Sequence, residues 1–294
     1  MEALASALPA VFHLWVFAAG ATVGSFLNVV IARVPQGESI VSPGSRCPRC
    51  KKPIAWYDNI PLVSWLLLRA KCRKCGEPIS ARYLLVELLT ALIAVALVRH
   101  FGPTPAALGA FIFASALVAL AYIDMDTWLL PHQITWPLLA LGLVSPLWNH
   151  ALSWKASLIG AGAGFAVFAA IALFGEQVLG RETMGWGDVW LLSGIGAWLG
   201  WQSLLPVILL SALQGSIVGV ALILAGRDPS ARAEPPPAEP APAPEAPPGP
   251  DVDWVPPKHA VPYGPFLSLA ALEVLLFGPR LVALWDQLLH RLLS

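Results

Sequence analysis

The chain has 294 residues, of which 57 % are hydrophobic and only 12 % are charged, and its formal net charge is zero. Soluble proteins usually carry about 25 % charged residues, so this composition excludes an ordinary soluble globular protein. A lipid bilayer is the natural solvent for so apolar a chain. The neutral balance also gives no reason to expect a nucleic-acid partner.

Eight stretches are long and apolar enough to be predicted as transmembrane helices. Met1 and Glu2 lead directly into the first stretch without a basic region, so we expect a retained helix and not a cleaved signal peptide. The predicted spans are residues 10–32, 83–99, 105–123, 129–148, 157–178, 187–201, 203–225 and 264–285. The expected fold is therefore an all-α polytopic membrane protein with about eight transmembrane helices.

The spans divide the chain into five parts. These are residues 1–32 (transmembrane helix 1), 33–82 (a polar loop that contains every cysteine), 83–226 (transmembrane helices 2–7), 227–262 (a linker) and 263–294 (transmembrane helix 8 and the C-terminus). Twelve of the 34 residues from Arg227 to Ala260 are proline. Because such a segment cannot bury a core, the linker is predicted to be disordered.

The basic residues predict the orientation in the membrane. Ten of the 18 Lys and Arg residues lie between Arg33 and Arg82, and loops rich in these residues face the cytoplasm. Alternation of the spans then places the turns near residues 124–130 and 179–187, and the proline-rich linker, on the same cytoplasmic side.

The four cysteines form two CxxC pairs. Cys47 and Cys50 are separated by 21 residues from Cys72 and Cys75, a spacing typical of a structural tetrathiolate zinc site. A reducing cytoplasm disfavours disulfides at these positions. Since four sulfurs leave no open coordination position, the predicted Zn²⁺ has a structural role.

Two groups of aspartates stand next to predicted spans. Asp124 and Asp126 end the third span, and Asp188 begins the sixth. Charged residues at such positions are costly in a membrane, which suggests a functional role. Asp124 closes an outside-to-inside helix and Asp188 opens an inside-to-outside helix. Both carboxylates are therefore expected at one depth, on the cytoplasmic side.

Two carboxylates at one depth can share a proton, since both cannot easily be ionised when they are close. One then activates a water molecule as general base, while the protonated partner polarises a scissile carbonyl and protonates the leaving amine. The alternative is that these residues only cap helices. A cap suits Asp188 at a helix N-terminus, whereas the helix dipole disfavours Asp124 at a helix C-terminus.

Several segments together resemble the bacterial type IV prepilin peptidases, also called prepilin leader peptidase/N-methyltransferases. In chain order they are Gly24-Ser25-Phe26-Leu27-Asn28, Cys47-Pro48-Arg49-Cys50, Asn59-Ile60-Pro61-Leu62-Val63-Ser64, Arg82-Tyr83, Ile123-Asp124-Met125-Asp126, Leu129-Leu130-Pro131, Gly185-Trp186-Gly187-Asp188 and Tyr263-Gly264-Pro265-Phe266. A single GxGD is weak support, but this ordered set covers nearly the whole chain and is specific.

The resemblance implies a GxGD-type aspartyl peptidase of the bacterial inner membrane. Such enzymes cut the basic leader from prepilins and pseudopilins after a glycine, on the cytoplasmic side. Many members then methylate the new N-terminus with S-adenosylmethionine. The family's catalytic aspartates fall on Asp124 and Asp188, and its tetracysteine loop falls on Cys47, Cys50, Cys72 and Cys75. No S-adenosylmethionine motif is visible in the sequence itself.

The chain departs from the family's pattern at two positions. His132 stands where the family often has Asp, and Trp190 stands where Lys is common. Neither change removes a catalytic carboxylate. Glu87 can either meet a basic residue of the leader or sit as a favourable anion in the first turn of its helix.

Two other functions have to be weighed. A presenilin-like GxGD protease would share the aspartates, but the cytoplasmic tetracysteine loop argues against it. A proton-coupled transporter would use Asp124 and Asp188 as relays, but the sequence offers no ladder of carboxylates across the membrane.

Overall fold

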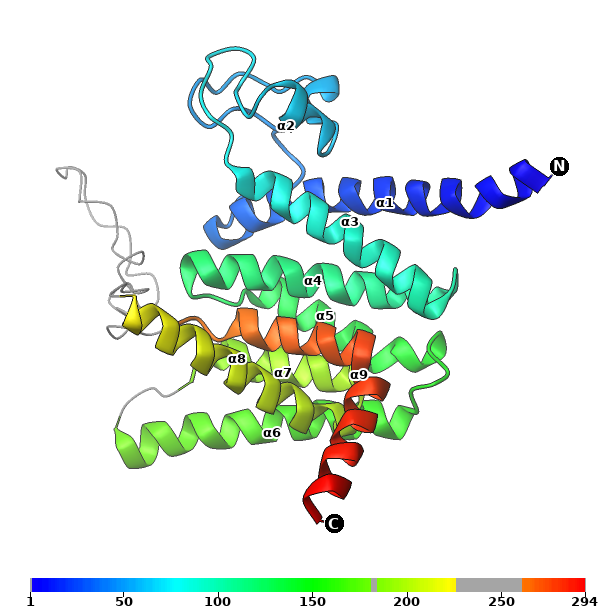
Figure 1. Cartoon of the computed structure of the whole chain (residues 1–294). Coiled ribbons are helices and arrows are strands. Elements are labelled where there is room, and N and C mark those ends of the chain that lie inside the picture. The colour runs from blue at the N-terminus through cyan, green and yellow to red at the C-terminus, as the bar shows by residue number, and fades with distance from the viewer. Residues whose placement is uncertain (1, 181–183, 226–260, 294) are drawn as a thin grey trace.

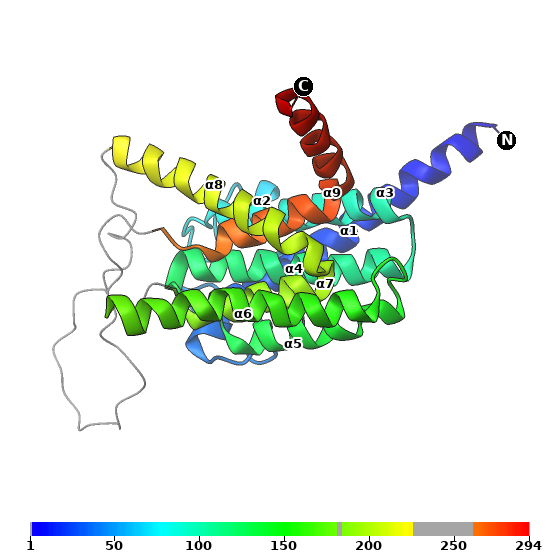
Figure 2. The same ribbon diagram turned by 90° about the horizontal axis from the view of Figure 1, so that it is seen from below.

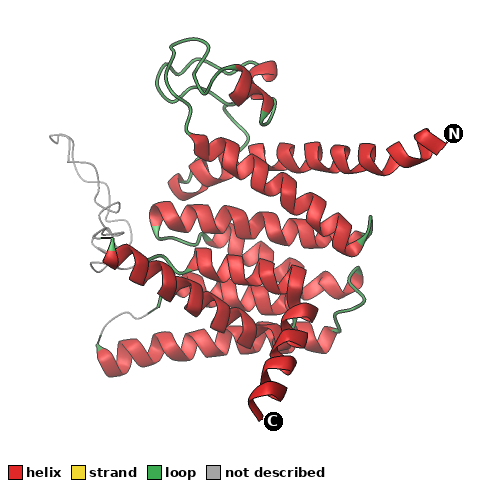
Figure 3. Cartoon of the chain, viewed as in Figure 1, coloured by secondary structure: helices red, strands yellow, loops and turns green. Residues whose placement is uncertain are grey.

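The computed structural model describes residues 2–180, 184–225 and 261–293. Over these residues the regular secondary structure is helical, and no β-strand is present (Figure 3). The α-helices are α1 (Glu2–Arg33), α2 (Val63–Leu67), α3 (Ala81–Phe101), α4 (Pro105–Thr127), α5 (His132–Val144), α6 (Trp154–Leu179), α7 (Trp186–Leu199), α8 (Leu204–Leu224) and α9 (Gly264–Leu293). Four short 3-10 turns lie at Val34–Gln36, Trp56–Asn59, Ser145–Leu147 and Trp201–Ser203.

Each predicted span coincides with one of these helices, whereas the five-residue α2 was not predicted. Five helices are long and apolar enough to cross a membrane, and they lie at Pro9–Gln36, Ala81–Phe101, Pro105–Thr127, Trp154–Val178 and Trp201–Leu224. The helices α5 and α7 have only 13 and 14 residues, less than a straight crossing requires. The count of eight spans therefore stays a prediction. The predicted disordered linker lies outside the described residues, apart from positions 261 and 262.

The helix α7 forms the centre of the bundle, where α4, α5, α6, α8 and α9 surround it (Figures 1 and 2). Its side chains at Val189, Leu191, Leu192 and Ile195 are fully buried. Contact with α6 is close because both helices carry glycine at the crossing: a Cβ on Gly160 would collide with the backbone of α7. Small residues allow this close approach in membrane proteins.

A second core joins α1 and α3 to α4. It includes Leu27 of α1, Val86 of α3 and Val118 of α4, all buried. The amide of Asn28 donates to the carbonyl oxygen of Tyr83 at 3.1 Å and links α1 to α3. The polar loop that connects these two helices stands beside one end of the pair (Figure 1).

The end of α4 turns the chain sharply toward α5. Trp128 adopts a left-handed conformation (φ 56°), and its N–H donates to the Asp124 carbonyl oxygen at 2.9 Å, which closes the last turn of the helix. Pro131 then precedes α5. This turn holds Asp124 at the end of a helix whose other residues are almost entirely apolar.

Candidate active site and metal centre

Asp124 lies buried in the last turn of α4, with only 6 % of its surface exposed. Its Oδ2 accepts a hydrogen bond of 2.9 Å from the backbone N–H of Gly264, the first residue of α9. Asp124 sits at the unfavourable end of its own helix, but the positive N-terminus of another helix points at it. That contact offsets the unfavourable dipole of α4.

Asp188 lies in the first turn of α7, after Gly185 begins the helix. Its Oδ1 is buried and has no hydrogen-bond partner among the described residues. Asp124 and Asp188 lie within electrostatic range of each other. The structure therefore brings the two predicted aspartates to the same end of the bundle.

Leu130 fills the space between the segments that carry the two carboxylates. A Cβ on Gly187 would lie 2.7 Å from the Leu130 Cβ, and a Cβ on Gly264 would lie 3.3 Å from a Leu130 methyl carbon. The same Cβ on Gly264 would lie 2.7 Å from Oδ2 of Asp124. The two glycines thus allow the starts of α7 and α9 to approach the turn after α4.

Sequence analysis missed two groups that lie at this site. The Tyr263 hydroxyl and the Ser211 hydroxyl share a hydrogen bond of 2.7 Å, and the charge of Asp188 acts on Tyr263. Ser211 is one of three polar side chains in α8, with Gln214 and Ser216, so polarity alone did not single it out in the sequence. The donor at Gly264 is a backbone N–H, which cannot be identified from side-chain types in the sequence.

Asp126 does not join the two other aspartates. Its carboxylate forms an ion pair with Arg82, at the start of α3. The Arg82 guanidinium also donates to the carbonyl oxygen of Tyr122 at 3.0 Å and lies over the ring of that tyrosine. Arg82 therefore attaches the end of the polar loop to the last turns of α4.

The two positions that depart from the family's pattern lie in one aromatic cluster. The ring of His132 stacks on Trp136 with centroids 5.1 Å apart, and Trp136 meets Trp190 edge-on at 6.0 Å. Trp190 also contacts Phe165 of α6. Ring packing thus occupies the positions where the family often has Asp and Lys.

The four cysteines converge as the sequence predicted. Each offers one Sγ, and all four atoms lie within 4.8 Å of one another. Sulfurs bound tetrahedrally at about 2.3 Å from a zinc ion lie roughly 3.8 Å apart, and the Cys47 and Cys75 sulfurs are separated by 3.8 Å. The donor set and its spacing fit a Zn²⁺ ion.

Two similar turns build this centre. In one, the N–H of Lys51 donates to the Cys47 carbonyl oxygen at 3.0 Å; in the other, the N–H of Gly76 donates to the Cys72 carbonyl oxygen at 2.9 Å. A backbone hydrogen bond from Cys50 lowers the pKa of Cys47 to about 7, whereas desolvation and hydrogen bonds to the other three sulfurs raise the pKa of Cys75 to about 11. A thiolate is the form that binds a metal.

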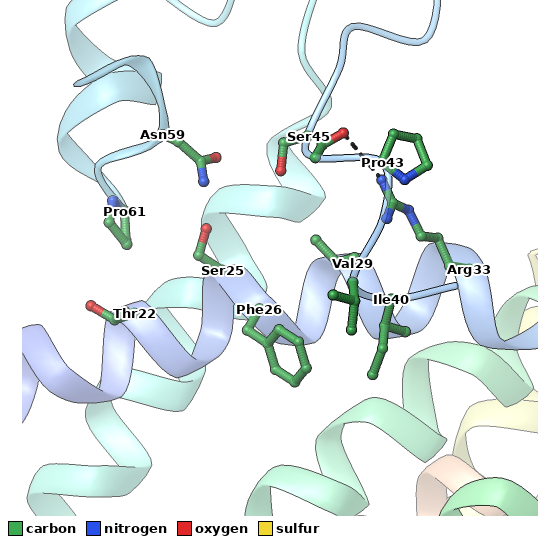
Figure 4. A pocket seen from close by; sticks show the side chains of 12 residues that line it. Thr22, Ser25, Phe26, Val29, Arg33, Ile40, Pro43, Ser45, Asn59 and Pro61 are labelled. Atoms are coloured by element: carbon green, nitrogen blue, oxygen red, sulfur yellow. Dashed lines mark hydrogen bonds between the residues drawn. The ribbon is translucent and has the colours of Figure 1, made fainter. Parts of the chain in front are cut away.

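The carboxylate of Glu87 is hydrogen-bonded to the protein's own backbone. It is buried in α3, and its Oε2 accepts a hydrogen bond of 2.7 Å from the backbone N–H of Leu62 in the polar loop. A pocket of about 350 Å³ opens between α1 and this loop (Figure 4). Its polar lining comes from Thr22, Ser25, Arg33, Ser45 and Asn59.

Comparison with known proteins places these features in a family. Residues 18–101 match the bacterial peptidase A24 N-terminal domain, and residues 111–220 match the type IV leader peptidase family. A prepilin leader peptidase/N-methyltransferase of Myxococcus xanthus (strain DK1622) is 43 % identical, over 92 % of this chain and 91 % of the relative. The chain belongs to the type IV leader peptidase family.

Other members of the family are similar over most of their length. Proteins with the same name in Aeromonas hydrophila and Burkholderia pseudomallei (strain 1026b) are 38 % and 35 % identical, over 94 % and 88 % of this chain and 94 % and 83 % of theirs. No solved structure gives a significant match. The N-terminal family domain contains the cysteine centre, and the peptidase domain contains Asp124 and Asp188.

Proposed function

We propose that this protein is an intramembrane aspartyl endopeptidase that removes the basic leader of type IV prepilins or pseudopilins after a glycine, and then N-methylates the new N-terminus. The observation that supports it best is the meeting of Asp124, Asp188 and the N-terminus of α9 at one end of a membrane bundle. The names of the relatives supply the substrate class and the second activity.

In the proposed mechanism Asp124 is the general base and Asp188 carries the proton. The Gly264 N–H donates to Asp124 and favours its carboxylate form, whereas Oδ1 of Asp188 lacks a donor among the described residues. Asp124 takes a proton from water as its oxygen attacks the scissile carbonyl carbon, and Asp188 donates its proton to the carbonyl oxygen. Collapse of the tetrahedral intermediate breaks the C–N bond. The proton held by Asp124 moves to the leaving amine, and a hydroxyl proton of the intermediate returns to Asp188 as the carbonyl re-forms.

The location that we propose is the inner membrane, with the dyad on the cytoplasmic side. The cysteine-rich loop carries ten of the chain's Lys and Arg residues. It leads into the start of α3, where Arg82 pairs with Asp126 at the end of α4. The positive-inside rule places both in the cytoplasm. The substrate's apolar helix would then lie in the membrane, with its leader in the cytoplasm.

We assign a structural Zn²⁺ to Cys47, Cys50, Cys72 and Cys75, since four thiolates complete its coordination. S-adenosylmethionine, when bound, would supply the methyl group. We propose that it binds in the pocket between α1 and the loop, which offers hydrogen-bonding side chains. The hydroxyl of Ser25 and the amide of Asn59 suit its ribose and base. The Arg33 guanidinium also lines the pocket, where it donates to the carbonyl oxygens of Ser39 at 2.9 Å and Gly44 at 3.4 Å.

The test is cleavage of a prepilin by the protein reconstituted in membranes. Asp124→Asn and Asp188→Asn should each lower the cleavage rate at least roughly 100-fold, because each removes one half of the acid–base pair. Asp126→Asn is the matched control: the same substitution, two residues from Asp124, should keep the rate within about tenfold of wild type since it breaks only an exposed ion pair.

The outcomes separate the alternatives. Wild-type cleavage by either Asp124→Asn or Asp188→Asn would exclude the proposed dyad. If wild type cuts no prepilin but moves protons in an Asp124-dependent manner, the transporter function replaces the protease. Folding of each variant is checked by its far-UV circular dichroism and by its elution from a sizing column.

A further inference from the structure

The short helix α2 in the cysteine-rich loop exposes an apolar face. Val63, Leu66 and Leu67 are 48 %, 62 % and 77 % exposed. They stand at positions i, i+3 and i+4, so they share one side of the helix. Large exposed apolar groups that gather on one side of a small domain mark a contact with a partner or a membrane.

The rest of the domain holds this face in place. On the other side of α2, the Ser64 hydroxyl donates to the Tyr57 carbonyl oxygen at 3.0 Å and accepts from the Ile60 N–H at 3.0 Å. The Trp65 ring donates to the Ile79 carbonyl oxygen at 3.2 Å. Residue Leu62 before the helix and Arg69 after it have left-handed backbone conformations. The helix is therefore a fixed projection with its apolar face outward.

The domain that carries this projection is rich in basic side chains. Residues 33–82 contain ten Lys and Arg residues against three Asp and Glu residues. Arg49 and Arg73 pair with Glu77 and Asp58. Within residues 33–82, all of which the structure describes, the exposed basic side chains that form no ion pair are Arg46, Lys51, Lys52, Arg69, Lys71 and Lys74. Two of them, Arg69 and Lys71, follow directly after α2.

The domain places this surface beside the transmembrane helices. In Figure 1, α2 lies on the side of the loop that is nearer to the N-terminus. Measured along the direction of α1, it stands at the same position as the first turns of α3. Both α1 and α3 are long and apolar enough to cross a membrane. A bilayer around these helices would therefore lie beside α2.

We propose that α2 and the basic residues around it form a docking surface for anionic phospholipid. Val63, Leu66 and Leu67 enter the boundary between headgroups and acyl chains, while Arg69 and Lys71 contact the phosphates above them. An apolar face flanked by basic residues is the arrangement by which protein segments bind at this depth, and anionic lipid attracts each basic residue near its surface.

Charge argues against two other occupants. The leader of the proposed substrate is basic, so the domain's excess of positive charge would repel it, and a second copy of this domain would be repelled for the same reason. A protein with an acidic surface is the remaining alternative, and the experiment has to distinguish it from lipid.

The experiment uses the full-length protein in nanodiscs that contain about a third anionic phospholipid, with the photoreactive residue p-benzoylphenylalanine in place of Leu67. The matched control carries the same probe in place of Leu68, the neighbouring leucine, which is only partly exposed. We expect lipid adducts at position 67 in large excess over position 68. Zinc content shows that both proteins are folded.

Removal of the flanking charge tests the electrostatic part. With the probe at position 67, Arg69→Gln and Lys71→Gln should each lower the ratio of docked to undocked domain by roughly fivefold. A change of this size corresponds to the attraction of one basic residue to an anionic lipid surface. The absence of lipid adducts at position 67 overturns the proposal. So do adducts that form only with a second polypeptide in native membranes, which would indicate an acidic protein partner.

Discussion

At the scale of single residues, the candidate active site depends on positions that have no side chain. Gly187 and Gly264 each stand where a Cβ would press on Leu130, and Gly264 also faces Oδ2 of Asp124. Leu130 cannot retreat easily, since it is itself buried. The geometry of the two carboxylates is therefore sensitive to one added methyl group.

Gly187→Ala should lower the cleavage rate by roughly 10- to 100-fold, because a Cβ 2.7 Å from the Leu130 Cβ must push the start of α7, and with it Asp188, out of place. Gly185→Ala is the control within the same motif: its Cβ would find its nearest neighbour at 3.7 Å, an ordinary contact. Prepilin cleavage assays on both variants give the comparison. Equal losses would show that the contact with Leu130 is unimportant.

Gly264→Ala should likewise impair cleavage by a factor of at least roughly ten. The new Cβ would displace the Asp124 carboxylate, which accepts a hydrogen bond from the Gly264 N–H. In Gly278→Ala, on the same helix, the nearest atom to the new Cβ lies at 3.8 Å. The prediction concerns kcat more than KM, since the change lies at the reacting groups. An effect on KM alone would contradict it.

At the scale of elements, α6 and α7 illustrate how small residues set helix distances. A Cβ on Gly164 would lie 2.6 Å from the Leu192 carbonyl oxygen. Ser193 donates to the Ala161 carbonyl oxygen at 3.0 Å, and Ser157 donates to that of Ala197 at 2.9 Å. These cross-helix hydrogen bonds require the close approach that the glycines allow.

Gly160→Ala should destabilise the bundle by about 1–3 kcal/mol, the usual effect of overpacking a rigid contact, because its Cβ would collide with the backbone of Gly196. Gly162→Ala, two residues away on α6, has nothing within 4 Å of its Cβ and should be neutral or slightly stabilising. Thermal unfolding of the detergent-solubilised variants measures both. A Gly162→Ala variant as unstable as Gly160→Ala would refute the packing explanation.

At the scale of the whole molecule, the cysteine centre and the dyad are built by separate parts of the chain. No ligand of the proposed Zn²⁺ comes from a transmembrane helix, and no carboxylate of the dyad comes from residues 33–82. The described contacts between the two parts include the Arg82–Asp126 ion pair and the hydrogen bond from Leu62 to Glu87.

Removal of zinc should therefore unfold the loop and leave the bundle folded. Cys50→Ser, or a chelator, should reduce the zinc content from one ion per chain toward zero, while far-UV circular dichroism retains most of its helical signal. Acid should act in the same direction, because protonation of the thiolates competes with the metal. Zinc release is therefore expected as the pH falls, and none as it rises from neutral. A bundle that unfolds together with the loop would contradict this separation.

The class of fold, the helices and the chemically distinctive residues could be predicted from residue types and their spacing alone. Hydrophobic runs of sufficient length became helices because a chain in lipid must satisfy its backbone hydrogen bonds internally. The CxxC spacing was enough to predict that the four cysteines converge, because each pair forms a local turn. Asp124 and Asp188 stood out because carboxylates are rare beside such apolar runs.

The surroundings of those residues depend on how distant segments pack, and they could not be predicted in this way. The donor to Asp124 is a backbone N–H 140 residues away in the chain, and every residue but proline has such a group. The separation of Asp126 from the dyad, the hydrogen bond between Tyr263 and Ser211 and the place of Leu130 follow from how helices pack. Packing depends on the shapes of distant segments, which a local pattern of residue types does not encode.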